Sequence, residues 1–291
     1  MPSKGGKKKG GGGAVATKSD SSGFPPEASC APSCVHFLDE DSKLMCITYP
    51  SIEALNLALG RLSCFAENKQ HKGKYIPLSK WREMPSTSGM VYEGHNFPSS
   101  VVKEWIGLAP EGDYAPSEKA LIDACMARRV LTRDKKGRWA IHFTYLIAGV
   151  EGDTETFRHE AMHALYFEHE PYRGLVSAVF QSDLPAHLLS FIKTYICSKG
   201  YSPDVTEDEF QAYLCCDDHE VVGGKKNAGS KQVTGIKERL RGYQKGEVSW
   251  QEGWVTLMLE GTAAGMAGIG SRVTPAPLAS GPSIGKRGRG R

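Results

Sequence analysis

The sequence predicts a mixed α+β fold: a small mixed or antiparallel sheet packed on a helix that carries two histidines and on further helices. Residues 44–49 and 129–146 have the β-branched, aromatic composition of strands. Residues 51–65 and 154–167 instead repeat apolar side chains at helical spacing. The second of these helices contains His159-Glu160-Ala161-Met162-His163. Because an α-helix has about 3.6 residues per turn, its two imidazoles share one face.

The composition is that of a globular protein with charged ends. The chain has 291 residues, of which 40% are hydrophobic and 24% charged, enough for one large domain or two small ones. Residues 1–24 carry five Lys against one Asp, and residues 272–291 carry five basic side chains and no acid. Since the net charge is +3, the body between them carries −6. Such a body shows no footprint of a nucleic-acid-binding domain.

The composition of the two ends of the chain predicts disordered segments. Residues 1–33 are rich in Gly, Lys, Ser and Pro, and residues 272–291 are rich in Pro, Gly and Arg. We expect both ends to be disordered, with a single domain over residues 34–271. Basic tails of this kind can contact RNA through its phosphates, which leaves weak nucleic-acid binding as an alternative function.

The spacing of the cysteines and the length of the apolar runs indicate where in the cell the protein is expected. The eight Cys lack the dense, regular spacing of a disulfide scaffold, and Cys30-x3-Cys34 has no matched second pair for a structural zinc site. The first residues form no apolar secretory signal, and no run of about 18 apolar residues predicts a membrane span. We therefore expect a soluble intracellular protein, cytoplasmic or nuclear, with mostly free thiols.

The segments before the metal-binding helix predict a sheet and its covering helices. Residues 68–100 are polar and irregular, and residues 94–98 resemble a turn. The regular elements expected are a strand at 44–49, a helix at 52–65 capped by Ser51, helices at 99–107 and 116–128, and a hairpin with arms at 129–133 and 138–146.

The second hairpin arm leads directly to the metal-binding helix. In zinc endopeptidases a strand runs beside the active-site helix, and its free edge can pair with an extended substrate. Residues 139–146 alternate in a way that suits this edge position and suits an interior strand equally well. Both interpretations stay open at this point.

The chemistry depends on His159, Glu160 and His163. Two imidazoles four residues apart can bind one metal ion, and the Glu beside the first can reach a water on that ion. The alternative is an amphipathic helix with two partly exposed histidines. A catalytic zinc site needs a third protein ligand, which leaves a coordination position for water.

The best candidate for the third ligand is Glu209. It lies in a predicted helix that Thr206 caps, after a connecting helix at 184–199. An acidic first turn is also common for structural reasons, because it complements the helix dipole. Four other side chains remain as substitutes: Glu207, Asp208, Asp217 and His219.

These two segments together resemble a gluzincin-type zinc metallopeptidase. Glu209-Phe210-Gln211-Ala212 is similar to the Glu-Phe-x-Ala-Asp segment of the CAAX-processing endopeptidases, whose Glu is the third zinc ligand. Tyr213 stands where that family has Asp. Those enzymes span membranes, and this sequence shows no spanning segment.

The resemblance implies a zincin-like fold with one Zn²⁺ held by His159, His163 and Glu209. It implies hydrolysis of a peptide or protein substrate by a zinc-bound water, with Glu160 as the general base. A zincin-like scaffold without activity is the alternative. The candidates for stabilising the oxyanion are Tyr166, Tyr172, Tyr201, His95, His187 and His219.

Overall fold

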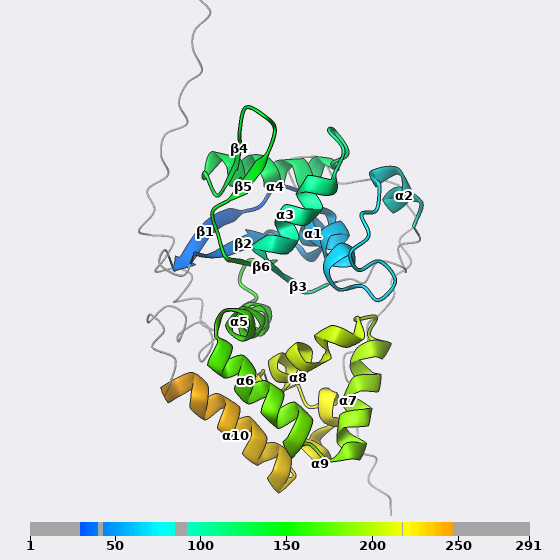
Figure 1. Ribbon diagram of the computed structural model, residues 1–291, viewed down its shortest axis with the longest axis vertical. Coiled ribbons are helices and arrows are strands. Elements are labelled where there is room, and N and C mark those ends of the chain that lie inside the picture. The colour runs from blue at the N-terminus through cyan, green and yellow to red at the C-terminus, as the bar shows by residue number, and fades with distance from the viewer. Residues whose placement is uncertain (1–29, 40–42, 85–91, 217, 247–291) are drawn as a thin grey trace, which may run out of the picture.

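The computed structural model describes residues 30–39, 43–84, 92–216 and 218–246. This part of the chain is mixed α+β, as the sequence predicts. Figure 1 shows a sheet with one group of helices above it, α5 directly below it, and a second group of helices below α5. The predicted tail at 272–291 and nearly all of the predicted tail at 1–33 lie outside the described residues, so nucleic-acid binding by these tails stays a prediction.

The main sheet is mixed and has the strand order β1-β2-β6-β3. β2 and β6 run parallel, whereas β1 pairs with β2 and β3 pairs with β6 in antiparallel fashion. The two interior strands are apolar and almost wholly buried, as expected of strands covered on both faces. The strands span Cys34–Asp39 (β1), Leu44–Tyr49 (β2), Gly94–Pro98 (β3) and Tyr145–Val150 (β6).

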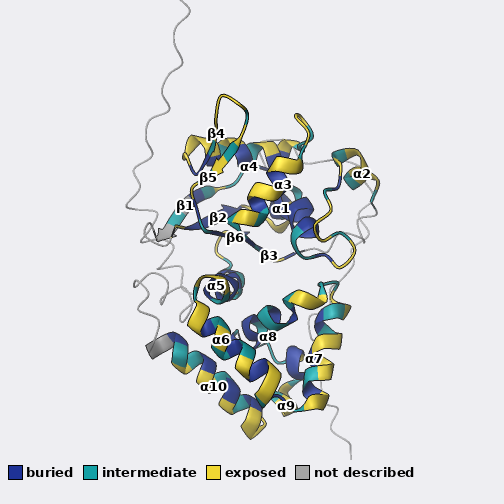
Figure 2. Ribbon diagram, in the orientation of Figure 1, coloured by how far each residue is buried: buried dark blue, intermediate teal, exposed yellow. Residues whose placement is uncertain are grey.

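Each face of the sheet builds a separate core, because successive side chains of a strand point to opposite faces. Leu44 and Cys46 of β2 join the core formed with α5 and the lower helices. Met45 and Ile47 join the core formed with the upper helices. Figure 2 shows the buried residues concentrated on the sheet and on the inward sides of the helices.

The helices divide between these two cores. Those above the sheet are α1 (Ile52–Glu67), α3 (Ser99–Leu108) and α4 (Pro116–Ala127), with the short α2 (Leu78–Glu83) and the hairpin β4 (Leu131–Arg133) and β5 (Trp139–Ile141) nearby. Those below it are α5 (Thr154–Glu168), α6 (Glu170–Ala178) with a π-helical turn at Val179–Asp183, α7 (Ala186–Ser198), α8 (Thr206–Cys215), α9 (Lys225–Ala228) and α10 (Lys231–Gly246), with 3₁₀ turns at Pro203–Val205 and Glu220–Val222.

Most predicted elements are present, and the Ser51 cap is confirmed because its hydroxyl accepts from the Ala54 amide. Two predictions about strands are wrong. Residues 94–98 are not a turn but the strand β3, which pairs along its length with β6. The arm predicted at 138–146 divides into β5 and β6, and β6 is an interior strand. Within the described residues, the sheet edge that runs beside α5 is therefore β3.

The predicted Thr206 cap is also wrong. The N-cap of α8 is Val205, and no side chain caps this helix. The chain enters α8 through the 3₁₀ turn at Pro203–Val205, so the Thr206 hydroxyl donates backward to the Pro203 carbonyl. A search of the described residues finds no helix both long enough and apolar enough to cross a membrane.

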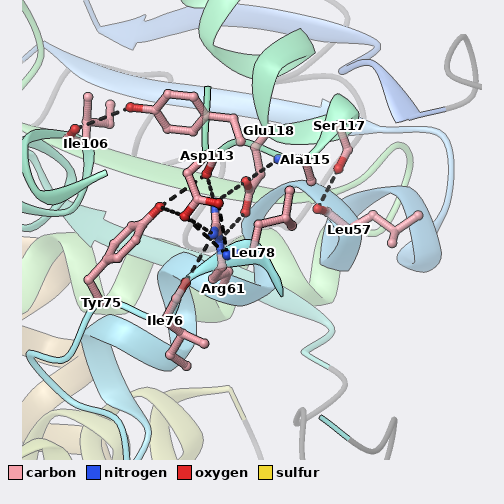
Figure 3. Close-up of polar contacts among 11 residues, drawn as sticks. Leu57, Arg61, Tyr75, Ile76, Leu78, Ile106, Asp113, Ala115, Ser117 and Glu118 are labelled. Atoms are coloured by element: carbon pink, nitrogen blue, oxygen red, sulfur yellow. Dashed lines mark hydrogen bonds and ion pairs between the residues drawn. The ribbon is translucent and has the colours of Figure 1, made fainter. Parts of the chain in front are cut away.

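A buried arginine ties the upper helices together (Figure 3). Arg61 of α1 donates from Nε and an Nη to both carboxylate oxygens of Glu118 at 2.9 and 2.6 Å. Its other N–H groups reach the backbone carbonyls of Ile76 and Asp113 at 3.1 and 2.7 Å. The Arg61 side chain is fully buried, so these acceptors replace its lost hydration.

We predict that Arg61→Leu lowers the free energy of unfolding by about 3–5 kcal/mol, because Glu118 is left buried without its cationic partner. Arg61→Leu combined with Glu118→Leu should recover much of this loss. Lys119→Ala, which breaks an exposed ion pair with Asp123, is the control and should cost under about 0.5 kcal/mol. Denaturant unfolding measures all three, and equal losses for Arg61→Leu and Lys119→Ala would contradict the prediction.

Candidate metal centre

The helix α5 is fixed against the sheet by its cap and by two close contacts. The Asp153 carboxylate caps the helix by accepting from the Thr156 amide at 3.1 Å. A Cβ on Gly149 would lie 3.0 Å from the Phe157 ring, and one on Gly94 would lie 2.4 Å from Oε1 of Glu160. Glycine at these two strand positions therefore lets the α5 backbone approach β6 and β3.

The helix α8 begins with three consecutive acids, each of which has a different contact. Glu207 accepts from the hydroxyls of Tyr166 and Ser177, which joins α8 to α5 and α6. Asp208 lies beside Nδ1 of His163 at 2.9 Å. Glu209 faces the two imidazoles. The helix dipole favours acidic side chains at this N-terminal end of α8.

His159, His163 and Glu209 come together as the sequence predicts. Each offers a ligand atom within 4.8 Å of the other two. The Nε2 atoms of the two histidines are 3.2 Å apart, and they lie 3.8 and 3.9 Å from the nearest Glu209 oxygens. Zinc–ligand bonds of about 2.0–2.1 Å in a tetrahedron correspond to ligand separations of about 3.3–3.5 Å. These three side chains therefore fit a small divalent ion with little movement.

Burial removes the carboxylate of this cluster from water. Glu209 is 3% exposed and His163 2%, and Oε2 of Glu209 has no hydrogen-bond partner among the described residues. Burial raises the pKa of Glu209 to about 8, although His163 lowers it. A bound divalent ion would supply the partner that the Glu209 carboxylate lacks.

The two imidazoles have opposite pKa shifts. Burial and the neighbouring His163 hold the pKa of His159 well below its ordinary value, which leaves its ring neutral and ready to bind a metal. Burial also lowers the pKa of His163, but Asp208 and Glu209 outweigh burial and raise it well above the ordinary value. A metal ion bound at Nε2 of His163 would therefore displace a proton.

Glu160 lies beside the cluster but is not one of its ligands. Burial raises its pKa to about 7, while His163 and a hydrogen bond from Asn96 lower it. That bond runs from Nδ2 of Asn96 to Oε2 of Glu160 at 2.7 Å, and Oδ1 of Asn96 accepts from the Tyr145 hydroxyl at 2.6 Å. Tyr145 thus fixes the orientation of the Asn96 amide, and Asn96 fixes Glu160. No sequence signal marks Asn96, because residues 94–98 resemble a turn in the sequence and become a strand by pairing with β6.

Glu67 adds a further carboxylate to the surroundings of the site. It ends α1, its carbonyl accepts from the Ser202 amide at 3.0 Å, and the neighbouring Asn68 forms an antiparallel bridge with Tyr201. Burial and then the charge of Glu209 raise the pKa of Glu67 well above its ordinary value. No sequence signal marks Glu67, because its position depends on how the upper and lower helices meet.

The other residues considered for the metal site differ in whether they contact the cluster of His159, His163 and Glu209. Tyr213 packs its ring edge-on against His159, with centroids 4.7 Å apart, so it supports this ligand by contact where the resembled family has Asp. Asp208 contacts a ligand nitrogen, and Glu207 bonds to hydroxyls. His219 is outside the cluster, and Asp217 lies outside the described residues. All eight cysteines are described, none forms a disulfide, and none joins the cluster.

Comparison of this chain with models of protein families, with curated proteins and with solved structures gives no match. The assignment of the site therefore rests on its own geometry: two imidazoles and a carboxylate at metal-ligand separations, with a second buried carboxylate beside them.

We predict that the purified protein binds about one zinc ion per chain and that His163→Ala or Glu209→Ala weakens this binding strongly. Because zinc displaces the proton on Nε2 of His163, affinity should fall as the pH is lowered. Titration against a chromogenic chelator measures both effects. The exposed His187 provides the control variant His187→Ala. Unchanged affinity in the His159→Ala/His163→Ala double variant would contradict the assignment.

Proposed function

We propose that this protein is a zinc-dependent hydrolase that cleaves peptide bonds. The observation that carries the proposal is the convergence of His159, His163 and Glu209, with Glu160 buried beside them. Two imidazoles and one carboxylate are a donor set that zinc prefers, and three protein ligands leave a coordination position for water.

The ion, when bound, would supply Lewis-acid activation of its water and of the substrate carbonyl. The residues of the chain then have separate tasks. Glu160 takes the proton of the attacking water, and its pKa of about 7 suits a group that accepts and returns a proton near neutral pH. Asn96 holds the carboxylate of Glu160 in one orientation.

Two features support an extended peptide as the substrate. β3 runs beside α5 and, within the described residues, pairs with β6 alone, so its outer edge is available to an added strand. The same strand carries Asn96, which binds Glu160. A peptide on this edge would therefore place its backbone carbonyls alongside the general base.

Among the six candidates, Tyr201 is the oxyanion donor that we propose. The Tyr166 and Tyr172 hydroxyls donate to Glu207 and Gln211, and His95 bonds to Ser63 of α1. Burial and then Glu209 raise the pKa of Tyr201 well above its ordinary value, so its hydroxyl, which also bonds to Tyr213, stays protonated. A neutral O–H group near the metal is the type of donor that a tetrahedral oxyanion needs.

We predict that Glu160→Gln keeps one zinc ion per chain and loses hydrolysis of a peptide library by at least about 100-fold, since general-base catalysis contributes roughly 10²–10⁴-fold. Gln has the shape of Glu and cannot accept the proton. Zinc content and peptide cleavage are measured on the same samples. Cleavage at the wild-type rate by Glu160→Gln would show that Glu160 is not the general base. Absence of cleavage by the zinc-loaded wild type would contradict the proposed activity.

We also predict that Asn96→Ala moves the acid limb of the kcat/KM pH profile upward by about 1–2 pH units. The hydrogen bond from Asn96 favours the charged form of Glu160, and bonds to charged groups contribute about 1.5–3 kcal/mol. Tyr145→Phe, which keeps the ring and releases only Asn96, should shift the limb in the same direction by less. An acid limb that stays in place in both variants would show that Asn96 does not act on the base.

A further inference from the structure

A chain of hydrogen bonds runs from α10 to Asp208, whose carboxylate lies 2.9 Å from Nδ1 of the candidate metal ligand His163. Its members are Gln244 of α10, Tyr172 of α6, and Gln211 and Asp208 of α8. Gln244 is 4% exposed, and Tyr172 and Gln211 are fully buried. The chain therefore joins the helix that carries Glu209 to two helices that carry no ligand. From Gln244 to Gln211 it is shielded from water, and the Asp208 side chain at its end is 23% exposed.

The direction of this chain is fixed at Gln211. Its Nε2 lies 3.1 Å from the Met162 carbonyl and 3.0 Å from Oδ1 of Asp208. Both of these are acceptors, so the nitrogen of the amide must face them and the oxygen must face the other way. Oε1 of Gln211 then needs a donor, which is the Tyr172 hydroxyl at 3.0 Å.

The order of donors and acceptors continues from Tyr172 to α10. Because its hydroxyl donates its one proton to Gln211, it can only accept from a third group. Nε2 of Gln244 fills this place at 2.8 Å. Burial raises the pKa of Tyr172 well above its ordinary value, which keeps the donating proton in place. Arg241, one turn before Gln244 on α10, also donates to the Cys215 carbonyl at the end of α8 at 2.6 Å.

The other end of the chain is the Asp208 carboxylate. The same oxygen that accepts from Gln211 lies 2.9 Å from Nδ1 of His163, somewhat off the N–H direction. A carboxylate is an acceptor, so it favours the proton on Nδ1 and leaves Nε2 to bind the ion. Nε2 is the atom that lies 3.2 Å from Nε2 of His159.

We propose that Tyr172 and Gln244 are positioning residues of the metal centre. Through Gln211 and Asp208 they hold the His163 ring with its proton on Nδ1 and its Nε2 lone pair toward His159 and Glu209. The inference rests on the proposed metal site and extends it, because it makes α6 and α10 parts of the centre. Without the Tyr172 hydroxyl, Oε1 of Gln211 is left buried without its donor, so the Gln211 amide and the Asp208 carboxylate that it binds are held less firmly.

Tyr172→Phe tests this directly, since Phe keeps the ring and removes only the hydroxyl. Zinc affinity of the full chain, measured by chelator competition, should fall about 10-fold or more, as is typical when an outer partner of a metal-bound His is lost. The visible absorption of the Co²⁺-loaded protein should change as well, because it reports the orientation of the ligands. Gln244→Met should shift both readings in the same direction by less, and it carries the test if Tyr172→Phe does not fold.

Tyr243→Phe is the matched control. Its ring packs 5.8 Å from that of Tyr172 between centroids, but it has no place in the chain. Thermal unfolding of the metal-free variants separates lost packing from lost metal affinity. Wild-type zinc affinity and Co²⁺ absorption in both Tyr172→Phe and Gln244→Met would overturn this inference and leave the proposed function standing. Failure of the wild type to bind zinc at all would overturn both.

Discussion

The burial of the Glu209 carboxylate against two imidazoles is the constraint on which the rest of the site depends. A carboxylate removed from water must take up a proton, find a cationic partner or bind a metal. Asp208 and Glu160 raise the pKa of Glu209 further, while His163 lowers it only in part. In the proposed centre, a divalent ion would stabilise Glu209 and would take the place of the Nε2 proton of His163.

The fold holds α5 and α8 together from two sides, which keeps Glu209 beside the two imidazoles. On one side, glycines in β3 and β6 let α5 lie close to the sheet, and Asn96 reaches from the sheet edge to Glu160. On the other side, α6 and α10 hold α8 through hydrogen bonds at both of its ends. Arg158 of α5 and Arg241 of α10 both donate to the Cys215 carbonyl, where the helix dipole is negative.

The convergence of the three candidate ligands could be predicted from the sequence. The spacing of His159 and His163 on one helix fixes their shared face, and a second acidic helix in the right order supplies the third candidate. The choice of Glu209 over Glu207 and Asp208 came from the resemblance to a known family. The orientation of α8 agrees with this choice: Glu207 bonds to a hydroxyl, Asp208 lies beside Nδ1 of His163, and Glu209 faces the two imidazoles.

The residues that position the site could not be predicted, since they depend on distant contacts. Asn96 is 64 positions from Glu160, and its strand contains Gly94 and Pro98, which are rare in strands, so only pairing with β6 makes it β. Gln244 is 72 positions from Tyr172. The position of residues 139–146 at the edge or in the interior stayed open for the same reason: alternation within this segment says nothing about which strands lie on either side.

The coordination of the bound ion is the central claim, and X-ray absorption spectroscopy of the zinc-loaded protein tests it most directly. The account predicts nitrogen and oxygen neighbours at about 2.0–2.1 Å, with the outer-shell scattering of two imidazole rings. Sulfur neighbours at about 2.3 Å would instead assign the ion to the cysteines. That result would contradict a centre built from His159, His163 and Glu209.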